Sequence, residues 1–119
     1  MGLWEAYYRR LWLDAVRSSR LSGSSVGLSF IEEVIKFSLE AERELRSWLN
    51  DVERGGCDEW VEALMGEIVR LAGLLEADVR EEARLYGIEG GRVLEAIALL
   101  NRVRRLASSI GGRCGRSSS

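Results

Sequence analysis

The chain has 119 residues, of which 46% are apolar and 30% charged, and its formal net charge is −2, a composition typical of one folded domain rather than of a disordered or membrane-embedded chain. It contains no histidine, proline, glutamine or threonine. Without histidine, catalytic triads and histidine-ligated metal sites are excluded, and without proline only glycine and serine remain as strong helix breaks. We therefore expect an all-α fold and few routes to catalysis.

The charged and amide residues indicate origin and location. Sixteen arginines accompany a single lysine, Lys36, and the only side-chain amides are those of Asn50 and Asn101. Few amides with abundant ion-pairing charge are typical of heat-adapted proteins, although a GC-rich genome produces the same arginine bias. No apolar run approaches the roughly 20 residues of a membrane span, and Glu5 and Arg9 interrupt the stretch that a secretory signal needs. We expect a cytoplasmic, thermophile protein without membrane contact.

Helical periodicity begins with residues 3–17, which predict an amphipathic helix with an aromatic face. A serine-rich break over residues 18–28 follows. Such a linker lets the helix dock on its own bundle in cis or on a second subunit in trans. The side chains of this face that we expect to bind a partner are Trp4, Tyr7, Tyr8, Leu11 and Trp12.

The second predicted helix starts at Ser29, because Glu32 follows three residues later in the spacing of a capping box. Gly55 and Gly56 are typical of its C-cap. Its apolar stripe consists of Phe30, Val34, Phe37, Ala41, Leu45, Trp48 and Val52.

The third predicted helix runs from Asp58 to Tyr86 before Gly87. Alternating three-and-four spacing predicts packing nearly parallel or antiparallel to its neighbours. A second strip of small residues, which includes Gly66 and Gly73, indicates a close approach by another helix. The apolar seam consists of Val61, Leu64, Ile68, Leu71 and Leu75.

The fourth predicted helix follows Gly90 and Gly91, carries a broad apolar face, and ends at Gly111 and Gly112. Short breaks between long amphipathic helices favour an antiparallel four-helix bundle of three core helices plus the N-terminal aromatic helix. We assign residues 1–112 to this single domain and residues 113–119 to a disordered tail.

Two acidic residues occupy positions on the third helix where the seam requires apolar side chains. Asp78 and Glu82 lie one helical turn apart, and carboxylates on a buried stripe need an ion-pair partner or a cation. They are weak candidates for a metal site. The alternatives are that the helix extends beyond the bundle there or that Arg104 neutralises one of them.

The last 24 residues contain five arginines and no acidic residue after Glu95. Such a patch is a candidate for anion or nucleic-acid binding, although the acidic middle of the chain would repel nucleic acid. The candidate residues are Arg102, Arg104, Arg105, Arg113 and Arg116.

Cys57 and Cys114 are too few for a zinc site. In an up-and-down bundle, however, the break after the second helix and the end of the fourth lie at the same end. A disulfide between them is therefore possible on topological grounds, although disulfides are rare in the cytosol outside hyperthermophiles.

From these observations we expect a small non-catalytic interaction or assembly protein without a cofactor, self-associating as a homo-oligomer. A nucleic-acid-associated subunit using the C-terminal arginines is the first alternative. A carboxylate-based metal-dependent hydrolase is the second.

Overall fold

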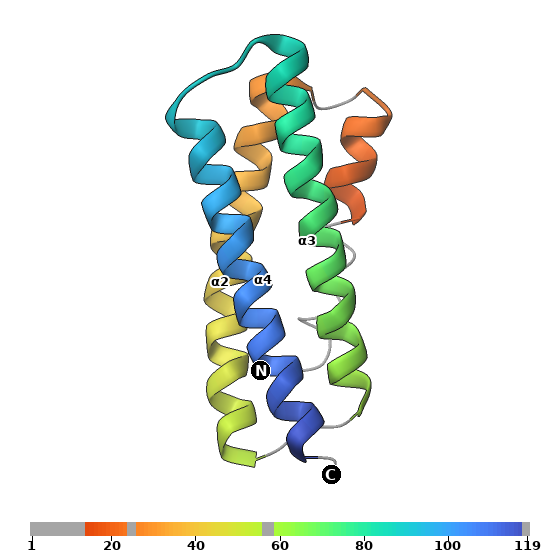
Figure 1. The fold of residues 1–119 in the computed structure, drawn as a ribbon, viewed down its shortest axis with the longest axis vertical. Helices are drawn as coiled ribbons and strands as arrows, with labels where there is room; N and C mark the ends of the chain where they lie inside the picture. The colour runs from red at the N-terminus through yellow and green to blue at the C-terminus, as the bar shows by residue number, and fades with distance from the viewer. Residues whose placement is uncertain (1–13, 24–25, 56–58, 118–119) are drawn as a thin grey trace.

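The computed structural model describes residues 14–23, 26–55 and 59–117, and within these ranges it contains helices and no strands (Figure 1). After a helical segment over residues 14–21, which we call the N-terminal segment, come α2 (Gly27–Gly55), α3 (Glu59–Tyr86) and α4 (Gly91–Ser117). The predicted all-α bundle is confirmed. None of the described helices has both the length and the apolar character that crossing a membrane requires.

Successive helices alternate in direction, as predicted, but their packing order is not the one expected from chain order. α4 packs along both α2 and α3, whereas α2 and α3 make few contacts with each other. As a result, the adjacent helices α2 and α4 run in the same direction (Figure 1). The N-terminal segment runs beside the part of α3 that precedes its C-terminal end.

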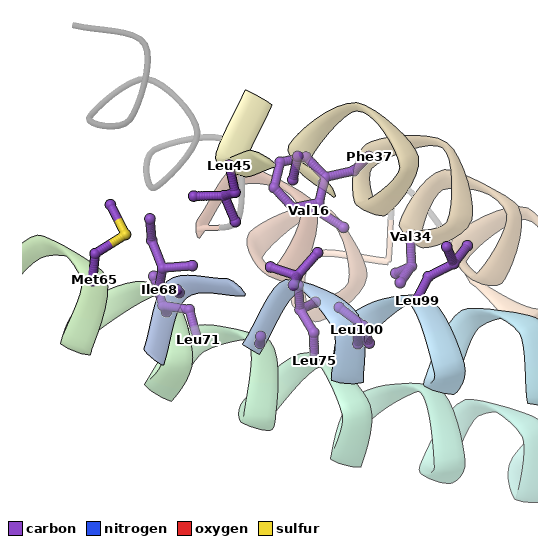
Figure 2. Close-up of a cluster of buried hydrophobic side chains, with 14 of the residues drawn as sticks. Val16, Val34, Phe37, Leu45, Met65, Ile68, Leu71, Leu75, Leu99 and Leu100 are labelled. Atoms are coloured by element: carbon purple, nitrogen blue, oxygen red, sulfur yellow. The ribbon is translucent and has the colours of Figure 1, made fainter. Parts of the chain in front are cut away.

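The core consists of the predicted stripes, because every residue named above for the α2 stripe and the α3 seam is buried. Figure 2 shows apolar side chains from α2, α3, α4 and the N-terminal segment directed into one interior. Val16 contributes to this core from the N-terminal segment and is 1% exposed. Burying a side chain of this size stabilises the fold by about 1.5–3 kcal/mol, so the segment is attached to its own chain by apolar packing.

The first helix ends later than predicted. Residues 18–21 are helical, and the amide of Ser22 still donates a hydrogen bond to the carbonyl of Ser18 at 2.9 Å. The helix ends at Leu21, and Gly23 follows with a φ of +80°, a left-handed conformation that favours glycine. The prediction of a break from residue 18 is therefore wrong, because a positive-φ glycine and not the serines ends the helix.

The second helix begins at Gly27, two residues before the predicted Ser29. Gly27 has a φ of +63°, and a Cβ atom on it would lie 3.6 Å from Cγ of Tyr86. Ser29 therefore lies inside the first turn, and the predicted capping box with Glu32 is wrong. The group that caps this helix comes from elsewhere in the chain, as shown below.

The third helix ends as predicted. Gly87 has a φ of +61°, and the amide of Ile88 donates to the carbonyl of Ala83 at 2.8 Å, which is the longer hydrogen bond of a Schellman motif. Its predicted first residue, Asp58, lies outside the described residues.

The fourth helix continues through Gly111 and Gly112 to Ser117, so the predicted helix end is wrong. A Cβ atom on Gly111 would lie 3.5 Å from Cβ of Met65 and 4.0 Å from the carbonyl oxygen of Glu62. Gly111 therefore lies where α4 approaches α3 closely, and its small size serves packing rather than termination.

The two glycines predicted to allow a close approach are more open. No described atom would lie within 4 Å of a Cβ on Gly66, and a Cβ on Gly73 would meet only Cζ of Arg104, at 4.0 Å. No helix of the described part packs on this strip. Packing of residues 1–13 or of a second copy against it stays a prediction.

Candidate functional site

The acidic pair singled out in the sequence is buried. Asp78 and Glu82 are 6% and 3% exposed, respectively, on the face of α3 that also carries the buried Leu75 and Val79. A carboxylate in such a position requires compensation by positive charge and hydrogen bonds. The structure supplies both from the N-terminal segment and from the start of α2.

Arg20 is the main partner of this pair. Its Nε donates to Oε2 of Glu82 at 2.7 Å, its Nη1 donates to Oδ1 of Asp78 at 3.3 Å, and its Nη2 lies 3.1 Å from Oε2 of Glu81. The guanidinium side chain is 10% exposed. Each of its three nitrogens thus meets a different carboxylate of α3.

The surroundings of Arg20 also determine its charge. Burial by itself lowers the pKa of the Arg20 guanidinium. The hydrogen bond that Arg20 donates to Glu82 and the charges of Asp78, Glu81 and Glu82 act in the opposite direction and prevail, so the pKa of Arg20 is raised. Arg20 is therefore a permanent cation at the centre of the cluster.

Arg17 completes the cluster from one helical turn earlier. Its Nε donates to Oδ2 of Asp78 at 3.0 Å, and its side chain is 34% exposed. Both oxygens of Asp78 are thereby occupied, one by each arginine. We call the five residues Arg17, Arg20, Asp78, Glu81 and Glu82 the arginine clasp.

The remaining oxygen of Glu82 caps α2. The backbone amide of Gly27 donates to Oε1 of Glu82 at 2.9 Å in a buried position. The first turn of α2 contains no acidic residue of its own, so the negative charge that the helix dipole favours there comes from α3. One carboxylate therefore connects the N-terminal segment, α2 and α3.

Arg17 and Arg20 neutralise the negative charges of the candidate metal ligands Asp78 and Glu82. All four carboxylate oxygens of Asp78 and Glu82 accept hydrogen bonds within the chain, so a cation would have to displace Arg20. In the described ranges, no three acidic or cysteine side chains are grouped so as to hold a metal ion. The expected neutralisation by Arg104 is wrong, because its Nη1 lies 3.9 Å from Oε2 of Glu76 instead.

The described C-terminal arginines face two different neighbours of α4. Arg102 lies 3.9 Å from Glu42 of α2, and Arg113 lies 3.1 Å from Glu53 of the same helix. The side chain of Arg116 lies outside the described part. Arg104 and Arg105 instead line a groove of about 530 Å³ between α3 and α4.

The cysteine and aromatic candidates are only partly within the described structure. Cys114 is buried, at 2% exposure, and is disulfide-bonded. Cys57, the only other cysteine in the chain, lies outside the described residues. The aromatic candidates Trp4, Tyr7, Tyr8, Leu11 and Trp12 also lie outside them.

A surface that the sequence analysis missed lies at the end of the bundle where α3 ends and α4 begins (Figure 1). Six of the seven large apolar side chains that are exposed in the described part belong to this end, and Leu94 is the most open at 69%. Periodicity did not reveal them, because each lies next to a helix end rather than on a stripe. We call this surface the end patch; its residues are Leu21, Val26, Leu28, Leu85, Tyr86 and Leu94.

The sequence analysis also missed Arg17 and Arg20. Two signals could have identified them: arginines three apart match the spacing of acids one turn apart on another helix, and α2 lacks an acid in its first turn.

Comparison of the chain with protein-family models, with curated proteins and with solved structures finds no match.

Proposed function

We propose that this chain is a non-catalytic assembly protein that binds a second copy of itself through the end patch. The observation that carries the proposal is the concentration of exposed apolar side chains at one end of the bundle. Exposed apolar side chains scattered singly are ordinary, whereas several gathered at one end of a bundle indicate a surface that another molecule covers. Leu39 of α2, at 48% exposure, is the only one of the seven that lies elsewhere.

The charges around the end patch favour a second copy as the occupant. Arg84 and Arg92 lie close in sequence to Glu89 and Glu95, and Arg92 already pairs with Glu95 at 3.1 Å. In a two-fold symmetric dimer each surface meets itself, so a rim with both signs can place arginine against glutamate. A rim of one sign would repel its own copy.

The arginine clasp supports the non-catalytic part of the proposal. Asp78 and Glu82 are the buried acids on which the hydrolase alternative depends, and their oxygens accept hydrogen bonds from Arg17, Arg20 and a backbone amide. Carboxylate oxygens engaged in this way stabilise the fold and are not open to a substrate or a metal ion. The hydrolase alternative therefore lacks its main residues.

Sedimentation equilibrium of the full chain and of Leu94→Glu tests the proposal. We expect the wild-type chain to have twice the monomer mass of 13.3 kDa. The variant places a charge in the centre of the interface, where an unpaired buried charge is strongly unfavourable, so we expect a monomer.

Leu39→Glu is the matched control, because it makes the same substitution at an exposed leucine of α2 outside the end patch. It should retain the dimer. A wild-type chain that stays monomeric up to its solubility limit contradicts the proposal. A Leu94→Glu variant that dimerises as well as the control assigns self-association to another surface, such as the N-terminal aromatic face or the glycine strip.

A further inference from the structure

The groove between α3 and α4 has a chemistry that differs from the rest of the surface. Its volume is about 530 Å³, within the range of small-molecule sites. No carboxylate lines it, although acidic residues outnumber basic ones in the chain. The lining residues are Val69, Asn101, Arg104, Arg105, Ser108 and Ser109.

The basic and hydroxyl groups of the groove are in register on α4. Arg104 and Ser108 are four residues apart, as are Arg105 and Ser109, so each guanidinium has a hydroxyl one helical turn further along the same wall. Guanidinium groups and hydroxyls together donate the hydrogen bonds that phosphate oxygens accept. The α4 side of the groove thus offers two guanidinium groups and two hydroxyl groups to a ligand in the groove.

The two arginines are available to a ligand. Arg105 is exposed and forms no ion pair with any described residue. Arg104 has only long contacts, at 3.9 Å to Glu76 and at 3.4 Å to Oδ1 of Asn101. By contrast, the shortest clasp contact of Arg20 is 2.7 Å.

The opposite wall leaves space above α3. Val69 is the one α3 residue in the lining, and a Cβ atom on Gly73, one turn later, would lie 4.0 Å from Cζ of Arg104. A large side chain at residue 73 would compete with Arg104 for this space. Gly73 therefore leaves room for the Arg104 side chain beside the groove.

We propose that the groove binds a small anion that carries phosphate groups, such as a diphosphate. Nucleic acid is less favoured, because a strand needs a continuous basic track and stacking side chains. The neighbouring Arg102 and Arg113 face acids of α2, and no aromatic residue lines the groove.

Isothermal titration of the full chain with sodium pyrophosphate at low ionic strength tests the proposal. We expect saturable binding that weakens about tenfold in Arg105→Gln, since a charged hydrogen-bonding group is lost. Arg43→Gln on α2 removes the same charge from an exposed arginine outside the groove and should bind like the wild type. Both variants should melt like the wild type, because neither arginine has an ion-pair partner in the described part.

Three outcomes overturn the proposal. The first is absence of saturable binding of pyrophosphate to the wild-type chain. The second is equal binding by Arg105→Gln and Arg43→Gln, which would reduce the effect to net charge. The third is tighter binding of oligothymidine than of pyrophosphate, weakened as much by Arg102→Gln as by Arg105→Gln, which would indicate a nucleic-acid surface along α4.

Discussion

The arginines near the two ends of the chain have the same chemistry and different roles. Arg20 in the N-terminal segment is 10% exposed and contacts three carboxylates, whereas Arg113 in α4 is 49% exposed and contacts the half-exposed Glu53. Water screens the second pair and not the first. Burial of the partners, and not the number of arginines, therefore decides which of them hold the fold together.

The difference in burial also explains why replacing a single residue of the arginine clasp should lower the stability of the fold strongly. A buried ion pair contributes modestly compared with an apolar replacement, but the loss of one partner leaves an uncompensated buried charge. An exposed pair that loses a partner leaves a charge that water solvates. Variants of buried and exposed arginines measure this contrast.

The largest effect is expected for Arg20→Met, which leaves Asp78 and Glu82 buried without their shared cation. We expect the free energy of unfolding, measured by urea denaturation, to fall by about 3 kcal/mol. Arg92→Met, which removes an exposed arginine from a pair at 3.1 Å, should cost at most about 0.5 kcal/mol. Equal losses in the two variants would show that burial does not govern these pairs.

The stability difference between the wild type and Arg20→Met has a defined pH dependence. Because the pKa of Arg20 is raised on folding, its stabilisation is complete below the pKa of an unfolded arginine and is lost only as pH rises through the higher folded value. The stability difference between wild type and Arg20→Met should therefore be constant from neutral pH to about pH 10. A steady decline over that range would mean that Arg20 loses its proton there.

The second prediction compares two glutamates that share Arg20. Glu82→Gln removes a buried charge that faces the guanidinium and the start of α2, and we expect a loss of about 2 kcal/mol. Glu81→Gln alters an acid with a 51% exposed side chain at a similar distance, and should cost about 0.5 kcal/mol or less. If chemical denaturation ranks Glu81 above Glu82, burial does not set the strength of these contacts.

Arg17→Met tests the outer half of the clasp. About a third of this side chain is exposed, and Arg20 remains beside Asp78 when Arg17 is lost. A decrease of about 1 kcal/mol in the free energy of unfolding is expected. A loss as large as that for Arg20→Met would show that the two arginines contribute equally to stability.

A small effect, of the same order as that of Arg92→Met, is expected from loss of the Arg113–Glu53 contact in Arg113→Met. Its contact with Glu53 is exposed on both sides and should contribute about 0.5 kcal/mol or less, a difference that disappears at high salt. Thermal melting at low and high ionic strength measures it. Persistence of a large difference at high salt would show that Arg113 stabilises the bundle by packing.

Periodicity predicted the fold well because helix packing depends on residues three and four positions apart. The α3 seam from Val61 to Leu75 and the α2 stripe are buried as expected. Helix ends were predicted less well where the decisive partner is distant in sequence. The cap of α2 is Glu82, 55 residues from Gly27, and no local pattern around Ser29 contains that information.

The candidate site shows the same division. Asp78 and Glu82 were found because carboxylates interrupt an apolar seam, which is a local signal. Their partners were not found, because sixteen arginines offer many equivalent choices and only the docking of the N-terminal segment selects Arg17 and Arg20. The groove escaped detection because it needs two helices placed side by side.

The contacts of Glu82 determine where the chain should tolerate an insertion. One carboxylate holds Arg20 before the first connection and Gly27 after it, so the two ends of this connection are fixed by α3. Closing a loop between anchored ends costs only about 0.6 kcal/mol more for each doubling of its length. The connection is therefore the place where a tag or a small foreign domain can be inserted with little loss of stability.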